Sequence, residues 1–223
     1  MGRIVDLMSQ PGNLRYAIAK GFEPAVRGFL WQLVRLRRPR FLFLGRGIKF
    51  VSAYNLRLGA HVAIGGYSYI ETSAKTPVIF GDNVTLREHA WVQCRSGLNP
   101  KGDGLELQRG VYIGPNAVIG VSGKIVIKAG CQIGAGVSFS AESHEFLDGS
   151  YTTGATARKG ITVGENCWFG NNVTVLDGVE IGAGSVVGAG SVVTKPLPAG
   201  CVAVGAPARI IRYTGAHQTE EPV

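Results

Sequence analysis

The sequence lacks any cysteine or histidine arrangement with the spacing of a metal site. Its four cysteines, Cys94, Cys131, Cys167 and Cys201, are 37, 36 and 34 residues apart, and none belongs to a C-x-x-C pair or a Cys/His cluster. The chain also shows no signal peptide with a charged start, an apolar stretch and a small-residue cleavage site. We therefore expect no bound metal, and reduced thiols in a cytoplasmic protein.

Long hydrophobic runs are also missing. The apolar stretches Phe29–Val34 and Phe41–Leu44 are far too short to span a bilayer, and arginines separate them. Positive charge is confined to one region, because residues 15–49 contain nine Lys or Arg and one acidic residue, Glu23. This region accounts for the whole net charge of +8. Since no nucleic-acid-binding motif accompanies it, we expect no nucleic-acid partner.

Glycine is abundant, with 33 residues, and it accompanies a strict repeat. Apolar residues recur at every sixth position in the C-terminal half: Val163, Phe169, Val175, Ile181, Val187 and Val193. Upstream blocks repeat the spacing: Leu58, Ile64 and Ile70; Phe80, Leu86 and Val92; Ile113 and Ile119; Ile127, Ile133 and Phe139. A period of six fits neither an α-helix nor a simple amphipathic strand. It predicts short strands and turns wound around a prism, with glycine permitting tight corners and, where needed, a positive φ.

The repeat divides the chain into three parts. Residues 1–50 form a basic segment in which a helix is expected over Leu14–Arg38, broken near Glu23-Pro24. Residues 51–212 are the repeat domain, with insertions near 95–112 and 140–162, and residues 213–223 are a tail. The helical segment has one apolar side: Leu14, Ile18, Phe22, Val26, Phe29, Leu30 and Leu33. This side could rest on an anionic membrane through residues 14–40, or it could cap the prism or pack in an oligomer.

The pattern [LIV]-G-x-x-x-x resembles that of the hexapeptide-repeat acyltransferases. The resemblance implies an all-β fold, namely a left-handed parallel β-helix of hexapeptide repeats with a short N-terminal helical segment. About fifteen hexads would make roughly five coils. A homotrimer and acetyl-CoA as the acyl donor are further implications of the resemblance.

Among the four histidines, His144 is the candidate catalytic base. His61 and His89 lie within regular hexads, and His217 lies in the tail, whereas His144 stands near the start of the second insertion. Residues 133–144 resemble the segment of galactoside and maltose acetyltransferases that ends in the catalytic base. Residues 144–149 are also similar to the H-x-x-D-G stretch of xenobiotic acetyltransferases, but one residue longer.

A second match covers residues 164–212 and ends in Gly205-Ala-Pro-Ala-Arg-Ile-Ile-Arg212, which is similar to the closing signature of the family. By this resemblance, Ala189 and Thr194 would line the pantetheine groove, and Asn171 would contact the pantetheine arm. Trp168 would flank the acetyl or acceptor end. The phosphates would meet three cations: Lys195, Arg209 and Arg212. The sugar-binding Asn and Asp of the galactoside enzymes have no acidic counterpart here, where the chain has Gly114, Asn116 and Ser122.

The sequence therefore predicts an acetyl-CoA-dependent O-acetyltransferase acting on a sugar of a cell-surface polysaccharide or its lipid-linked precursor. The predicted location is the cytoplasm, with a peripheral position on the inner face of the membrane as an option. Alternatives are a xenobiotic (antibiotic) O-acetyltransferase, an amino-sugar N-acetyltransferase and a non-catalytic scaffold. A γ-class carbonic anhydrase is disfavoured, since no two histidines stand five residues apart.

Overall fold

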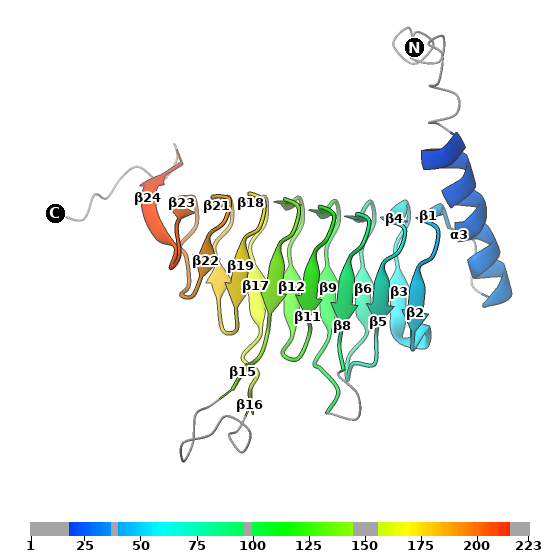
Figure 1. Ribbon diagram of the computed structural model, residues 1–223, viewed down its shortest axis with the longest axis horizontal. Helices are drawn as coiled ribbons and strands as arrows, with labels where there is room; N and C mark the ends of the chain where they lie inside the picture. The colour runs from blue at the N-terminus through cyan, green and yellow to red at the C-terminus, as the bar shows by residue number, and fades with distance from the viewer. Residues whose placement is uncertain (1–17, 37–39, 96–99, 145–155, 215–223) are drawn as a thin grey trace, which may run out of the picture.

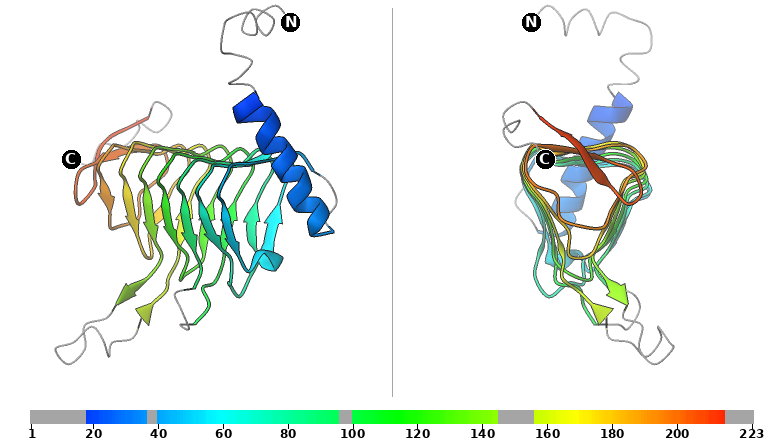
Figure 2. Two further views of the ribbon diagram at one scale, coloured as in Figure 1. Left: turned by 45° about the vertical axis from the view of Figure 1, so that its right-hand side comes forward. Right: turned by 90° about the vertical axis from the view of Figure 1, so that its left-hand side faces the viewer.

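The computed structural model describes residues 18–36, 40–95, 100–144 and 156–214. Short strands wind around a three-sided prism, with a helix across its N-terminal end (Figures 1 and 2). Apart from the last strand, each face is a parallel sheet whose neighbouring strands come from successive coils. The predicted left-handed parallel β-helix is confirmed. No helix in the described ranges is both long and apolar enough to cross a membrane.

We number the faces in the order in which the chain visits them. Face 1 contains β1 (Leu42–Leu44), β4 (Val62–Ile64), β7 (Thr85–Leu86), β10 (Tyr112–Ile113), β13 (Gln132–Ile133), β18 (Trp168–Phe169), β21 (Val186–Val187), β23 (Cys201–Val204) and the antiparallel β24 (Arg209–Tyr213). Face 2 contains β2 (Lys49–Val51), β5 (Tyr69–Glu71), β8 (Trp91–Gln93), β11 (Val118–Gly120), β14 (Ser138–Ser140), β19 (Thr174–Leu176) and β22 (Val192–Val193). Face 3 contains β3 (Leu56–Leu58), β6 (Val78–Phe80), β9 (Leu105–Leu107), β12 (Ile125–Ile127), β17 (Ile161–Val163) and β20 (Glu180–Ile181).

The core is a set of ladders of apolar side chains inside the prism. On face 1 the register places Ile133 beside Phe169, and Phe169 beside Val187. Phe169 is fully buried, and its ring lies 6.1 Å from that of Phe139 on face 2. Residues alternate between inside and outside along each strand, so Trp168 remains 54% exposed beside the buried Phe169. Each coil thus buries its apolar residues against the neighbouring coils, as the six-residue period predicts.

The glycines that follow the apolar residues have a different role from the one expected. Neither Gly164 nor Gly182 has a positive φ. A Cβ on either residue would collide with the backbone of the next coil, at Ala183 and Ala199 respectively. The left-handed conformation occurs two residues later in the turn, at Asn166 (φ 55°) and Gly184 (φ 68°). The glycine after each apolar residue therefore permits close stacking of coils, and Asn, His or Gly supplies the turn geometry.

The N-terminal helix covers the first coil with its less apolar side. The π-helical turn η1 (Ile18–Phe22) continues directly into α3 (Glu23–Val34), with Pro24 in the first turn. The helix therefore changes type near Glu23-Pro24, where a break was expected, but it is not interrupted there. Gly28 lies so close to β1 that a Cβ would collide with the Leu42 carbonyl. The buried Gln32 side chain donates to the Arg40 carbonyl (2.9 Å) and accepts from the Arg40 N–H (2.7 Å). These contacts fix the helix across the end of the prism.

Two boundaries differ from the sequence-based expectation. The first coil begins at Leu42, inside the basic segment 1–50 that was expected to precede the repeat domain. Strand β9 lies inside the expected insertion 95–112, where buried Leu105 and Leu107 belong to a regular coil of face 3. These strands alternate between buried and exposed residues as the other strands do. They were missed because their apolar residues do not continue an unbroken series in which every sixth position is apolar. The tail from 215 onward lies outside the described residues.

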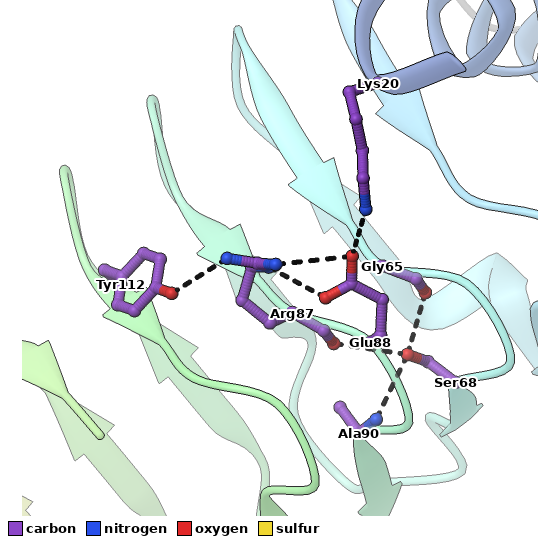
Figure 3. Close-up of polar contacts among 7 residues, drawn as sticks. All are labelled: Lys20, Gly65, Ser68, Arg87, Glu88, Ala90 and Tyr112. Carbon is purple, nitrogen blue, oxygen red and sulfur yellow. Dashed lines mark hydrogen bonds and ion pairs between the residues drawn. The ribbon is translucent and has the colours of Figure 1, made fainter. Parts of the chain in front are cut away.

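A charged network at the corner between faces 1 and 2 ties the helical segment to the coils (Figure 3). Glu88 accepts from the guanidinium of Arg87 (2.8 Å) and pairs with Lys20 of the helical segment (2.9 Å). Arg87 also donates to the Tyr112 hydroxyl (3.2 Å). Hydrogen bonds from Arg87, and then from Lys20, lower the pKa of Glu88 to about 2. The carboxylate is therefore stabilised in the folded state.

Replacing Glu88 with Gln is expected to lower the unfolding free energy by about 1 kcal/mol at pH 7. Because the folded-state pKa lies below the ordinary value of 4.5, this contribution is present above pH 4.5 and is lost as the pH falls towards 2. Urea unfolding of both proteins at pH 7, 4 and 2.5 measures the difference. The explanation fails if the difference is as large at pH 2.5 as at pH 7.

Candidate active site

His144 lies at the corner between faces 2 and 3, where the second insertion leaves the prism. The chain leaves face 2 after β14, and β15 (Ser143–His144) then pairs antiparallel with β16 (Thr156–Ala157). These two strands form a ribbon that projects from the prism (Figure 1). The His144 side chain is 57% exposed. The imidazole is therefore accessible at the base of a projecting insertion.

A carboxylate that the sequence analysis did not identify lies beside His144. Glu142 Oε1 is 3.4 Å from His144 Nε2, and the other carboxylate oxygen is 3.4 Å from the guanidinium of Arg158. A hydrogen on Nε2 facing this carboxylate leaves Nδ1 as the basic atom. The sequence spacing could have indicated this pair, because Glu142 and His144 are two residues apart and residues two apart on a strand point to the same side. The arrangement can orient a neutral imidazole and stabilise it once it is protonated.

Asp177, also not singled out from the sequence, fixes the end of the insertion. Its carboxylate accepts the backbone N–H groups of Lys159 (3.1 Å) and Gly160 (2.8 Å). Asp177 belongs to the turn after β19, so it joins the insertion to the next coil. Gly160 has φ +90° and lies against Lys124, so that a Cβ would collide with the Lys124 carbonyl. The end of the insertion, at Lys159 and Gly160, is therefore fixed against the neighbouring coils.

The residues expected to bind coenzyme A fall into separate places on one protomer. Thr194 and Lys195 are exposed at the same corner as His144 and follow β22. Strands β14, β19 and β22 are neighbours on face 2, so the spacing between strands places these residues about 10 Å from His144 along the prism. A groove of about 240 Å3 lies on face 3 beside this corner, next to Lys159 and Gly160. A second groove, of about 650 Å3, shares Thr162 and Glu180 with it but extends across face 3 towards face 1, to Gly164 and Gly182. The 650 Å3 groove continues to Pro196–Pro198, directly after Lys195.

The other expected residues lie across face 2 from that corner. Trp168 projects from face 1, and Asn171 and Ala189 occupy turns between faces 1 and 2. The Asn171 side-chain oxygen accepts the Ala135 N–H (2.9 Å), so part of this amide supports the neighbouring coil. Arg209 and Arg212 are exposed on β24 at the C-terminal edge of face 1. A single protomer therefore does not bring all of the expected residues together.

The cysteines offer no accessible nucleophile. All four are buried free thiols. Burial raises the pKa of Cys94 to about 12, so its thiolate is scarce at neutral pH. Within the described ranges, no group of three or more His, Cys, Asp or Glu side chains is arranged to hold a metal ion. His144, exposed and beside Glu142, is thus a candidate for acid–base chemistry, while the exposed His89 lines a separate groove of about 600 Å3 beside the helical segment.

Comparison with known proteins bears on the repeat and the fold. The sequence profile "Bacterial transferase hexapeptide (six repeats)" matches residues 160–195. Residues 160–195 therefore carry the hexapeptide repeat that this profile describes. It is 34% identical over 128 residues to galactoside O-acetyltransferase of Escherichia coli, an alignment that covers 57% of this chain and 63% of that protein. The hexapeptide-repeat resemblance expected from the sequence is confirmed, and the match spans less than two thirds of that relative.

Solved structures with this domain share the fold. AntD, an N-acyltransferase from Bacillus cereus solved as a point mutant with dTDP and coenzyme A, aligns with a TM-score of 0.53 and 16% identity, covering 78% of this chain and 82% of that one. A galactoside acetyltransferase in complex with coenzyme A aligns with a TM-score of 0.50 and 24% identity, covering 77% of this chain and 69% of that one. At these identities the likeness establishes the fold of the hexapeptide-repeat domain.

Proposed function

We propose that the protein transfers an acetyl group from acetyl-CoA to a sugar hydroxyl, with His144 as general base. The observation that carries the proposal is the position of His144 beside Glu142, at the corner that also presents Thr194 and Lys195. Galactoside O-acetyltransferase, to which the chain is 34% identical, has the same type of activity by its name.

The reaction needs one proton-transferring group. His144 Nδ1 takes the proton of the acceptor hydroxyl as its oxygen bonds to the thioester carbonyl carbon. The carbon–sulfur bond then breaks, and the imidazolium returns the proton to the departing thiolate, which gives an O-acetyl sugar and free coenzyme A. Glu142 stabilises the imidazolium while it carries the positive charge. No covalent enzyme intermediate is required.

We place the acetyl-CoA on the C-terminal side of His144 along the corner. Thr194 would line the pantetheine arm, and Lys195 would meet a phosphate, as both are exposed at this corner and Pro196, the next residue, lines the 650 Å3 groove. Arg209 and Arg212, exposed on β24 at the edge of face 1, would provide further phosphate contacts from the neighbouring protomer. The exposed cations and the adjoining groove fit a long anionic ligand.

The remaining coenzyme-binding residues require a second protomer in this proposal. In a homotrimer, the corner between faces 1 and 2 of one protomer would meet the corner between faces 2 and 3 of its neighbour. Trp168, Asn171 and Ala189 of that neighbour would then face His144 and Thr194. Their separation on a single protomer supports a site shared between subunits.

The proposed acceptor is a sugar of a cell-surface polysaccharide or its lipid-linked precursor, reached on the N-terminal side of His144. Asp103, which pairs with Lys75 (2.7 Å), and Ser122 lie along the same corner there. The proposed location is the cytoplasm or the inner face of the membrane. The stretch 145–149, which motivated the xenobiotic alternative, lies outside the described residues.

The acceptor is tested by incubating the protein with acetyl-CoA and a panel of glycans, amino sugars and hydroxylated antibiotics. Thiol release and a gain of one acetyl mass are measured together. Transfer to a glycan hydroxyl supports the proposal, whereas transfer only to antibiotics or only to amino groups supports one of the alternatives. Tight binding of coenzyme A without transfer to any acceptor argues for a scaffold.

Replacing Asp177 with Ala is expected to lower kcat/KM for acetyl transfer about tenfold or more. The two N–H groups at Lys159 and Gly160 lose their acceptor, so the insertion carrying His144 is held less firmly. Asp82→Ala is the matched control, because Asp82 caps the Ala60 N–H (2.7 Å) in a turn far from His144. Equal losses of activity in the two variants would mean that Asp177 acts only through general stability.

A further inference from the structure

Helix α3 packs against the prism with one side, and its opposite side is exposed to solvent. The side containing Pro24, Gly28 and Gln32 is buried against the first coil. Because neighbouring residues in an α-helix are about 100° apart, Phe22, Val26 and Leu30 lie on the opposite side. Figure 2 shows the helix lying across the end of the prism, so that this side faces away from the coils. The apolar side therefore does not cap the β-helix.

We call this surface the outer face and define it by six residues: Phe22, Val26, Phe29, Leu30, Leu33 and Phe41. They are exposed by 68%, 40%, 49%, 51%, 55% and 70% respectively. Phe41, which precedes β1, extends the helical stripe, and a groove of about 440 Å3 lies between Phe41 and the helix. Large apolar side chains at this density on one surface are typical of an interaction site.

Positive charge lies at one end of the outer face. The described residues from 18 to 46 contain five basic side chains and one acidic side chain, Glu23. Glu23 pairs with Arg27 and Arg46, and Lys20 pairs with Glu88. Among the described residues, no ion pair involves Arg35 or Arg40, and both are exposed at the end of the helix beside Leu33 and Phe41. An apolar stripe bordered by arginines matches the boundary between acyl chains and anionic headgroups.

We propose that the outer face binds an anionic phospholipid bilayer, with α3 lying in the interface and the prism standing on its N-terminal end. Two copies of this surface would bring identical positive charges together, which disfavours a second copy as the occupant. The proposal rests on the exposed helix and its charge and does not depend on acyl transfer. It explains why a segment already fixed by its inner side keeps large apolar residues in solvent.

The test is co-sedimentation of the full chain with vesicles of phosphatidylcholine containing phosphatidylglycerol, at physiological and high salt. The wild type is expected to bind these vesicles, to bind pure phosphatidylcholine more weakly, and to dissociate as salt rises. Phe29→Glu combined with Leu30→Glu is expected to lower the partition coefficient at least about tenfold. Ile211→Glu is the control, since Ile211 is 60% exposed on β24, at the end of the prism opposite the helix (Figure 1).

The double variant should remain folded, because Phe29 and Leu30 do not belong to the side of the helix that is buried against the prism. Thermal unfolding of the variant checks that it is folded. Failure of the wild type to bind anionic vesicles overturns the proposal, as does equal binding by the double variant. If the wild type instead forms a larger assembly that the double variant abolishes, the occupant is a second copy. Acetyl transfer in solution is measured in parallel, so loss of membrane binding and failure of the proposed reaction are distinguished.

Discussion

Replacing His144 with Asn is expected to lower the rate of acetyl transfer by about a thousandfold, while coenzyme A binds as before. General base catalysis contributes roughly a hundredfold to ten-thousandfold, and Asn cannot accept the acceptor proton. Only the chemical step should change, because His144 is exposed on the insertion and supports no coil. Single-turnover kinetics and equilibrium binding of coenzyme A measure the two effects separately.

The matched control is His61→Asn. His61 occupies a left-handed turn (φ 55°) and stacks on Phe41, and Asn adopts this turn at Asn83 in the next coil. This variant should retain the wild-type rate. If His144→Asn retains more than about a third of the rate, His144 is a loop histidine and the proposed mechanism is wrong.

The largest expected effect on stability comes from Phe169→Ala. Removing this fully buried ring leaves a cavity between two neighbouring coils and against Phe139, which should lower the unfolding free energy by about 3–5 kcal/mol. Denaturant unfolding followed by circular dichroism measures the loss. Stacked coils share one core, so the damage should extend to the adjacent coils and appear as increased hydrogen exchange there.

Trp168→Ala on the same strand provides the comparison. The Trp168 side chain projects outward and is half exposed, so its removal should cost less than about 1 kcal/mol in an isolated protomer. Similar losses from the two substitutions would contradict the alternation of inside and outside residues on which the fold rests.

The fold could be predicted from the sequence because its core is periodic. Residues such as Phe169, Ile181 and Val187 recur every six positions and all lie inside the prism. The apolar side of the N-terminal helix was also evident from spacing. Its exposure was not, because helical periodicity identifies a stripe without saying what covers it. Gly28 and Gln32 make the actual contact, and neither belongs to an apolar pattern.

The candidate site was harder to predict, because proximity around a prism depends on which corner each turn occupies. The spacing indicated His144 as an exception to the repeat, but it did not show Glu142 as its partner or Asp177 as the residue fixing the insertion. It also could not be predicted from the sequence that Ala189 and Thr194, only five residues apart, lie at opposite edges of face 2. The single strand β22 lies between them and carries the chain from one corner of the prism to the next.

The central proposal is an active site shared between subunits, and complementation tests it most directly. His144→Asn and Ala189→Trp, the latter intended to block the pantetheine groove, are each expected to inactivate the enzyme. They are co-expressed with different tags, and the mixed trimers are purified on both tags. If His144 and Ala189 of one site come from different protomers, mixed trimers with either composition regain one wild-type site in three, or about a third of the activity. Mixed trimers as inactive as the two parents would contradict the shared site.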